Sequence, residues 1–318
     1  MIKTIKKLLY PVLFILMGLV VLVFPAFINY FNTDSFLFDF SSFLKDYPAF
    51  QYVVGISLLL FGVFGVLYFI FLSKDNDVFV IHRASDGDYG SGGLSYSKTT
   101  KGDRDEIVFE SIISLKDHAP DQIKLEKKQI KKFYSNLPAD KKIAFLGIAT
   151  MPSLVYAGFV VGENGKSVSY YHWNRTKAKA IRIKTFGKPQ SLIKDETITP
   201  KKKSDDYVIC ISTSYQIEKA FVSSQFKTAN ILYYKLNSLG KDAITNKNEI
   251  AEIANNVKTI ISEIESVNTT IHLLLACSAE LCFAIGQRLN SPALPIIRVY
   301  SFDKKELNKW NWCIELKE

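Results

Sequence analysis

The stretch IHLLLACSAELCFAIGQRL, residues 271–289, decides the fold. It opens with an apolar run of strand length, continues through a short turn of small residues and ends in an apolar helical segment. The stretch IAFLGIATMPSLVYAGFVV, residues 143–161, aligns with it without a gap and pairs Gly158 with Gly286. The same order of strand, sharp turn and helix in both places indicates an internal repeat.

Strands and helices alternate around both copies. In the first half, about residues 76–185, we expect strands within 77–86, 107–115, 143–148 and 167–173, and helices at 121–137 and from 151. In the second half, about residues 205–318, we expect strands at 207–211, 230–236, 271–276, 296–302 and 312–316, and helices at 248–267 and from 279. Such alternation implies a largely parallel sheet covered by helices. We predict an α/β domain, residues 76–318, of two Rossmann-like subdomains in a pseudo-twofold arrangement.

Two long uncharged segments precede this domain. Residues 8–31 and 48–72 contain no charged side chain, and each segment exceeds the roughly 20 residues needed to cross a bilayer. Lysines precede the first segment and follow the second, and positive flanks remain in the cytoplasm. We expect residues 1–75 to form an α-helical two-span membrane hairpin, with the N-terminus and the soluble domain cytoplasmic. Neither span contains an ionisable side chain, so a simple anchor and a pore built from several chains both stay open.

The positive charge of the chain lies in the soluble part. The formal net charge is +9, and the first 73 residues contribute little of it. A basic surface beside a bilayer suits anionic lipid headgroups or phosphate-bearing ligands, and a solvated lysine-rich surface explains it equally. The four cysteines form no C-x-x-C pair, so we expect reduced thiols, as in the cytoplasm.

The sequence lacks the common catalytic signatures. It has no H-E-x-x-H, no G-x-S-x-G, no P-loop and no Cys/His cluster with metal-ligand spacing. His272 lies inside a predicted strand, which favours a structural histidine. No histidine is near Ser278 in the sequence to activate it as a nucleophile. We therefore expect a protein that is not an enzyme and needs neither a cofactor nor a metal ion.

The two repeated turns are candidate anion sites. A helix that begins at the carboxyl edge of a parallel sheet presents free N–H groups, which can bind phosphate. Thr150 and Ser278 occupy equivalent positions and suit N-caps, and capping alone would explain both residues. An anion site requires in addition that the repeat bring both edges to one cleft.

The run IHLLLACSAELCFAIGQRLNSPALPIIRVYSFD, residues 271–303, resembles the SAVED domain. In that domain an apolar strand, a small-residue turn, a helix carrying A-I-G and a further strand follow one another. SAVED domains look like two fused CARF-type Rossmann subunits, so the resemblance implies two CARF-like halves. With its two N-terminal spans, the chain is similar to the transmembrane SAVED effectors of CBASS anti-phage systems.

The resemblance implies a receptor for a cyclic di- or trinucleotide made by a cGAS/DncV-like nucleotidyltransferase. The expected binding residues are the two turns, the end of one strand, two aromatic residues and one arginine: Cys277, Ser278, Ala279, Glu280, Thr150, Met151, Pro152, Ser153, Ser212, Thr213, Ser214, Trp173, Phe302 and Arg175. Trp173 and Phe302 would stack on bases or lie in the core, and Arg175 would pair with phosphate. Glu280 would repel a phosphate, so we expect it to accept a hydrogen bond from a base amine or a ribose hydroxyl.

The implied function is that of an anti-phage effector in the bacterial inner membrane. Ligand binding would drive homo-oligomerisation, and the clustered membrane helices would disrupt the lipid bilayer. Duplex nucleic acid is not an expected partner. One alternative is a membrane-bound ring nuclease that degrades the cyclic oligonucleotide, and another is a structural subunit of a larger membrane complex.

Overall fold

The computed structural model describes part of the 318-residue chain. The described residues are 15, 52–53, 55–64, 77–84, 106–112, 120–138, 141–163, 165–174, 179–188, 190–200, 204–240, 243–264, 269–302 and 309–317. The chain divides into two compact units, Met1–Asn76 and Asp77–Glu318.

In the first unit, the predicted spans fall mostly outside the described residues. Of the segment 8–31 only Ile15 is described, and of the segment 48–72 residues 52–53 and 55–64 are described, all of them helical. Large apolar side chains of this helical part, among them Phe61 and Phe64, are exposed. Within the part of the chain that the structure describes, no helix has the length and apolar character needed to cross a membrane.

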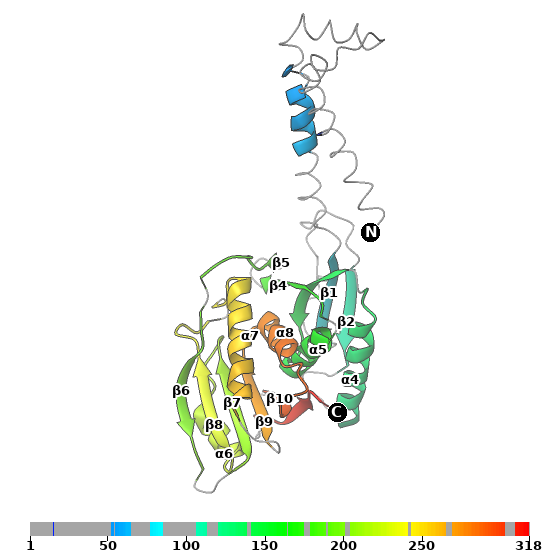
Figure 1. Cartoon of the computed structure of the whole chain (residues 1–318). Coiled ribbons are helices and arrows are strands. Elements are labelled where there is room, and N and C mark those ends of the chain that lie inside the picture. The colour runs from blue at the N-terminus through cyan, green and yellow to red at the C-terminus, as the bar shows by residue number, and fades with distance from the viewer. Residues whose placement is uncertain are drawn as a thin grey trace, which may run out of the picture. The chain divides into compact units, whose positions relative to one another are not determined.

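The first half of the second unit is built on a five-stranded sheet of order β2-β1-β3-β4-β5 (Figure 1). Its elements are β1 (Asp77–Ala84), β2 (Glu106–Ser111), α4 (Pro120–Ser135), β3 (Lys142–Ile148), α5 (Met151–Glu163), β4 (Val168–Asn174) and β5 (Lys179–Arg182). The first four strands are parallel, and β5 pairs antiparallel with β4. Apolar residues of β1 and β3 on one face pack against α4 and α5, because alternate strand positions face the same side.

The second half is built on a six-stranded sheet of order β11-β10-β9-β7-β8-β6. Its elements are β6 (Ile193–Ile198), β7 (Asp206–Ser212), α6 (Lys219–Gln225), β8 (Asn230–Lys235), α7 (Lys247–Ser262), β9 (Thr270–Ala276), α8 (Ala279–Arg288), β10 (Ile296–Ser301) and β11 (Trp312–Glu315). Strands β8, β7, β9 and β10 are parallel to one another, whereas the edge strands pair antiparallel, β6 with β8 and β11 with β10.

The two sheets repeat one plan. The order β2-β1-β3-β4-β5 corresponds to β8-β7-β9-β10-β11, and the last strand is antiparallel in both. The registers also agree: Phe79 faces Ala144 across β1 and β3, and Val208 faces His272 across β7 and β9. The α/β prediction is confirmed. Strands β5 and β6 and helix α6 were not predicted. The antiparallel edge strands β5, β6 and β11 make both sheets mixed.

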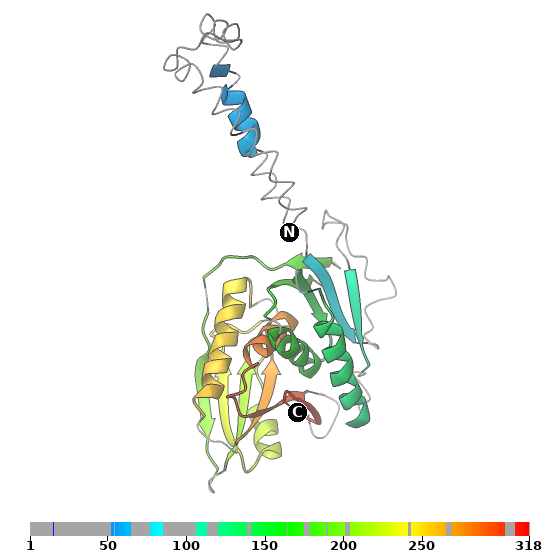
Figure 2. The same ribbon diagram turned by 45° about the vertical axis from the view of Figure 1, so that its right-hand side comes forward.

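Helices α5 and α8 lie side by side between the sheets in both ribbon views (Figures 1 and 2). A Cβ atom at Gly158 would lie 1.9 Å from the carbonyl oxygen of Phe283, and one at Gly286 would lie 1.9 Å from that of Val155. The two contacts are reciprocal, because Phe283 is the repeat equivalent of Val155. Only glycine permits such an approach of two helix backbones. Gly158 and Gly286 therefore allow α5 of the first half and α8 of the second half to pack at close range.

Local signals account for most element boundaries. Helix α7 begins after Asn246, whose side chain accepts from the Glu249 N–H while the Glu249 carboxylate accepts from the Asn246 N–H. It ends at Ser262, five residues before the predicted end at 267.

All four cysteines are free, and Cys210, Cys277 and Cys282 are buried, as expected of reduced core thiols.

Candidate ligand-binding site

The first turns of α5 and α8 lie at the same end of the domain. A Cβ atom at Gly147, near the end of β3, would lie 3.1 Å from Cβ of Ala279 at the start of α8. Further along, Gly158 meets Phe283 and Gly162 meets Gln287. Because the contacts advance together along both segments, the helices run in the same direction. Two helix N-termini, each with partial positive charge, therefore lie close together beside the ends of parallel strands.

The second-half part of the site joins the ends of β7 and β9. The N–H groups of Thr213 and Ser214 both donate to the carbonyl oxygen of Ala276, at 3.0 and 2.8 Å. Ser212 and Thr213 are buried, and the Ser212 hydroxyl accepts from the Ile217 N–H at 3.1 Å. The structure thus brings the predicted residues 212–214 beside the predicted turn 277–280.

Ser278 carries the clearest mark of a binding position. It is the N-cap residue of α8, but its side chain makes no capping hydrogen bond. Its Oγ atom is buried and has no hydrogen-bond partner in the structure. The prediction that this side chain serves as a cap is therefore wrong. A buried hydroxyl without a partner is costly, and a ligand group at this point would satisfy it.

The thiol and hydroxyl beside Ser278 are also enclosed. Burial raises the pKa of the Cys277 thiol to about 12, against a smaller opposite effect of the Thr213 hydroxyl. Apart from that thiol, Thr213 Oγ1 has no partner in the structure. The Cys277 thiol donates weakly to the carbonyl oxygen of Ile211 at 3.6 Å. Cys277 is therefore a neutral lining group rather than a nucleophile.

In the first-half turn, residues 150–153, the two hydroxyl groups form a hydrogen bond with each other. The Thr150 hydroxyl donates to Ser153 Oγ at 3.0 Å, and both side chains are buried. Pro152 is buried, whereas Met151 is half-buried and packs against the main core. The two copies of the turn therefore differ, because the pair of hydroxyls in the first half has no counterpart at Ser278.

One contact crosses between the halves at this end. His172 of β4 lies with Nδ1 3.3 Å from Oε1 of Glu280 in the first turn of α8. The Glu280 side chain is 4% exposed, whereas that of His172 is 33% exposed. In the described part of the chain, Glu280 has no other hydrogen-bond partner. The predicted binding residue Glu280 is thus a nearly buried carboxylate in contact with His172.

The predicted aromatic residues lie at the ends of corresponding strands. Trp173 is half-buried and packs against a cluster that includes Ile81 and Leu146. Phe302 is half-buried, with its ring centroid 5.1 Å from that of Trp310. Arg175 lies outside the described residues. Base stacking by Trp173 and Phe302 stays a prediction, and these contacts account for both as core residues.

A family model matches the chain over residues 126–316, from within α4 to the residue after β11. The family is described as SAVED, the SMODS-associated and fused to various effectors sensor domain. The match covers more than half of the chain. This chain belongs to the SAVED family.

One solved structure supports the same fold. The chain is similar to the Acinetobacter baumannii Cap4 SAVED/CARF-domain containing receptor with the cyclic trinucleotide 2'3'3'-cAAA, with a TM-score of 0.51 and 16% identity, over 90% of this chain and 63% of that one. The same receptor with 3'3'3'-cAAA gives a TM-score of 0.49 and 14% identity, over 89% of this chain and 62% of that one. This chain therefore spans less than two thirds of the length of these receptors. A search of curated proteins found no match.

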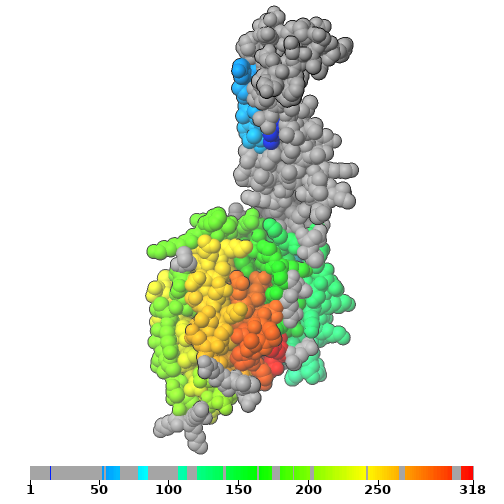
Figure 3. Space-filling model, in the orientation of Figure 1, coloured from blue at the N-terminus to red at the C-terminus, as the bar shows by residue number. Residues whose placement is uncertain are grey.

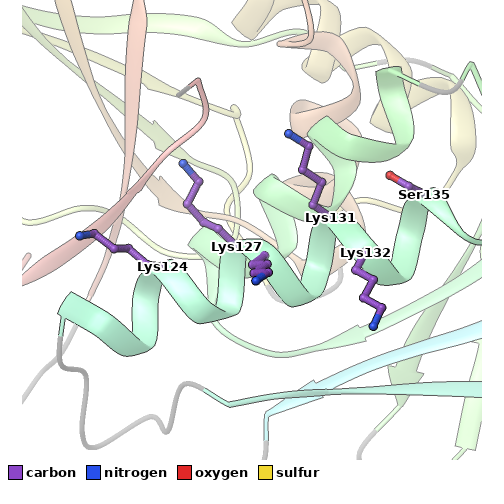
Figure 4. A pocket seen from close by; sticks show the side chains of 6 residues that line it. Lys124, Lys127, Lys131, Lys132 and Ser135 are labelled. Atoms are coloured by element: carbon purple, nitrogen blue, oxygen red, sulfur yellow. The ribbon is translucent and has the colours of Figure 1, made fainter.

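Two hollows of the SAVED domain lie away from the paired turns. The larger, about 630 Å³, is lined by Lys124, Lys127, Lys128, Lys131, Lys132 and Ser135, all on α4. Figure 4 shows these lysines projecting from a single helix in several directions, so this hollow is an open helix surface. The smaller, about 300 Å³, lies between α7, α8 and the end of α5. Neither hollow is lined by the predicted binding residues.

Two residues that lie beside the predicted binding residues were not predicted, His172 and Tyr215. His172 is 108 positions from Glu280, so no local sequence pattern could predict their contact. Tyr215 follows the predicted residues 212–214, and burial raises its pKa to about 12, with smaller contributions from the Cys277 and Cys282 thiols beside it. The signal for Tyr215 was its position directly after the end of a buried strand, the region where such sheets bind ligands.

Proposed function

We propose that the SAVED domain binds a cyclic di- or trinucleotide at the end where α5 and α8 begin. We infer that the halves are CARF-like subdomains related by a pseudo-twofold axis between these helices. The observation that carries the proposal is the reciprocal packing of Gly158 and Gly286, which sets two helix N-termini side by side. A ring with two or three phosphates suits such a paired arrangement, because each N-terminus can hold one phosphate. The Cap4 receptor of similar fold was solved with a cyclic trinucleotide.

The surrounding residues have complementary roles in this proposal. The Ser278 hydroxyl donates to a phosphate oxygen, and the Thr150 and Ser153 pair opens to do the same in the first half. Glu280, held by His172, accepts from a base amine or a ribose hydroxyl, since it would repel a phosphate. Trp173, Phe302 and Arg175 are proposed to contact the ligand from the strand ends.

We propose further that the chain is a membrane effector of a CBASS anti-phage system, acting downstream of a cGAS/DncV-like nucleotidyltransferase. Support comes from the uncharged segments 8–31 and 48–72, and from the large apolar side chains exposed on residues 52–64. Exposed apolar surface of this extent favours contact with lipid. Ligand binding would drive homo-oligomerisation, and the clustered segments would disrupt the bacterial inner membrane from its cytoplasmic side.

The experiment has two stages. A thermal-shift screen of the full chain in detergent, with cyclic di- and trinucleotides, should reveal one ring that raises the unfolding midpoint in proportion to its occupancy. That ring should then release dye from liposomes that contain the protein. No shift with any ring would contradict the receptor proposal. A shift without dye release at saturating ligand would contradict only the effector proposal.

A second candidate activity is cleavage of the ring, favoured by the His172–Glu280 contact. An imidazole beside a carboxylate is the arrangement of a general base, which could activate a ribose hydroxyl. We propose that the domain is a receptor and leaves the ring intact. Incubation of the ligand with the protein, followed by chromatography, decides between the two. Linear products that disappear in a His172→Ala variant would establish the nuclease.

A further inference from the structure

A second hollow lies at the opposite part of the α5–α8 pair from the paired turns. Its volume is about 300 Å³, at the lower end of small-ligand sites. Its lining comes from four elements and the segment before β4: Gly162, Gly165, Lys166, Ser167, Val168, Tyr170, Lys247, Ala251, Ala254, Ala284, Gln287 and Arg288. In Figure 3 the surfaces of α7, in yellow, and α8, in orange, meet on one face of the molecule. Because residues 162–170 belong to the first half and residues 247–288 to the second, both halves of the SAVED domain contribute to this hollow.

Among the side chains that the structure describes, those lining the hollow include three cations and no acidic group. Lys166 comes from the first half, and Lys247 and Arg288 come from the second. Both Lys247 and Arg288 are exposed, and within the described part of the chain neither the Lys247 ammonium nor the Arg288 guanidinium makes a hydrogen bond or an ion pair. Positive groups that line one hollow produce a local positive potential, which attracts anions.

Of the positive charges of Lys247 and Arg288, only that of Arg288 is favoured by the dipole of its own helix. Arg288 lies in the last turn of α8, where a positive charge is favourable. Lys247 is the first residue of α7, where the helix dipole opposes a positive charge. The cost of this position is small, because Lys247 is exposed and Glu249 lies in the same turn, but an anion in the hollow would make the position favourable.

Hydrogen-bond donors complete the lining. The Tyr170 hydroxyl donates to Gln287 Oε1 at 2.7 Å, which leaves the amide nitrogen of Gln287 as the donor group without a partner in the structure. Ala251 and Ala284, from adjacent helices, leave the space open because their side chains are small. The available groups are those that phosphate oxygens require, namely an amide N–H, an ammonium and a guanidinium.

We propose that this hollow is a second anion site, which binds the phosphate group of a small phosphate ester such as a nucleoside monophosphate. The phosphate contacts Lys247 and Arg288, and Gln287 donates to it from between them. Lys166 and Tyr170 of the first half also line the hollow, but the Lys166 ammonium donates to the carbonyl oxygen of Leu137 and the Tyr170 hydroxyl donates to Gln287. The phosphate contacts therefore come from the second half. The site is separate from the paired turns and does not depend on the function proposed for them.

Calorimetric titration of the full chain in detergent tests this site. The probes are inorganic phosphate and adenosine monophosphate, compared with chloride at matched ionic strength. We expect saturable binding by the wild type and at least ten-fold weaker binding by the double variant Lys247→Gln/Arg288→Gln. The matched control, Lys227→Gln/Lys258→Gln, removes the same charge from exposed positions outside the lining and should bind as the wild type does.

A neutral variant separates shape from charge. Ala251→Leu fills the hollow without changing a charge, and it should also weaken phosphate binding at least ten-fold. The proposal is overturned if neither probe binds the wild type, or if the control pair weakens binding as much as the cavity pair. A Ser278→Ala variant should keep phosphate binding, so failure at the paired turns and failure here give different results.

Discussion

His172 Nδ1 and Glu280 Oε1 lie 3.3 Å apart and join strand β4 of the first half to helix α8 of the second. Glu280 is nearly buried, so its carboxylate depends on this partner. We expect His172→Ala to destabilise the protein by roughly 1–3 kcal/mol, the cost of leaving a buried charged group without its hydrogen bond. Thermal unfolding of the full chain in detergent measures the loss. His172→Gln restores a donor and should recover much of it, whereas equal losses in both variants would contradict this role.

The close approach of α5 and α8 predicts a cost for any side chain at the crossing. Gly286→Ala places a Cβ atom against the Val155 carbonyl oxygen, so the helices must separate. We expect a loss of roughly 1–3 kcal/mol or more, which lowers the unfolding midpoint by about 2–4 °C per kcal/mol. Gly240→Ala is the control, because its Cβ atom would have no atom nearer than 3.9 Å. An unchanged midpoint in Gly286→Ala would show that the helices do not pack this closely.

The internal repeat could be predicted from the sequence because each copy lies within one short segment. The buried strands β3 and β9, the turns after them and the glycines of α5 and α8 each lie within nineteen consecutive residues. Strand β6 gave no such signal, because its six residues IKDETI include three charged side chains and form an exposed edge. Helix α6 has only seven residues, too few to show a helical period.

Some features of the candidate site could likewise be predicted from the sequence, and others could not. The turn 277–280 and residues 212–214 could be predicted because they follow buried strands directly. The difference between the two turns could not, since it depends on which hydroxyls find partners once folded: Thr150 finds Ser153, and Ser278 finds none. The contact of His172 with Glu280 depends on how the halves pack, which no local pattern records.

The unpartnered hydroxyl of Ser278 predicts an effect on binding without an effect on stability. Removing a buried polar atom that makes no hydrogen bond should leave the free protein as stable as before or slightly more stable. Ser278→Ala should therefore keep the unfolding midpoint while it weakens ligand binding about ten-fold, the value of one hydrogen bond to a charged group. Ser262→Ala, an exposed serine on α7, serves as the control in calorimetry. Wild-type affinity in Ser278→Ala would remove this residue from the site.

The buried His82 predicts a dependence of stability on pH. Its Nδ1 lies 3.0 Å from the Tyr134 hydroxyl, and burial lowers its pKa from 6.5 to about 3. Between these values the unfolded chain binds a proton and the folded protein does not, so stability falls as the pH decreases. From pH 7 to pH 5 this group should reduce the free energy of unfolding by about 2 kcal/mol.

The non-titrating variant His82→Gln isolates this contribution. Denaturant unfolding at several pH values between 5 and 7 should give a smaller slope of stability against pH for the variant than for the wild type. Comparing slopes removes the constant cost of the substitution, including any loss of packing against Phe109 and Tyr134. Identical slopes would mean that His82 has the same pKa in the folded and unfolded protein, which would contradict the lowered pKa.

Hydrogen exchange with a bound ring tests the central claim most directly. The full chain is compared with and without a saturating cyclic oligonucleotide, at a ligand concentration fixed by the thermal-shift screen. If α5 and α8 present their first turns to one ligand, protection should increase in both segments, 149–154 and 277–282. Protection confined to one segment, or increased only elsewhere in the domain, would contradict a shared site built from the two halves.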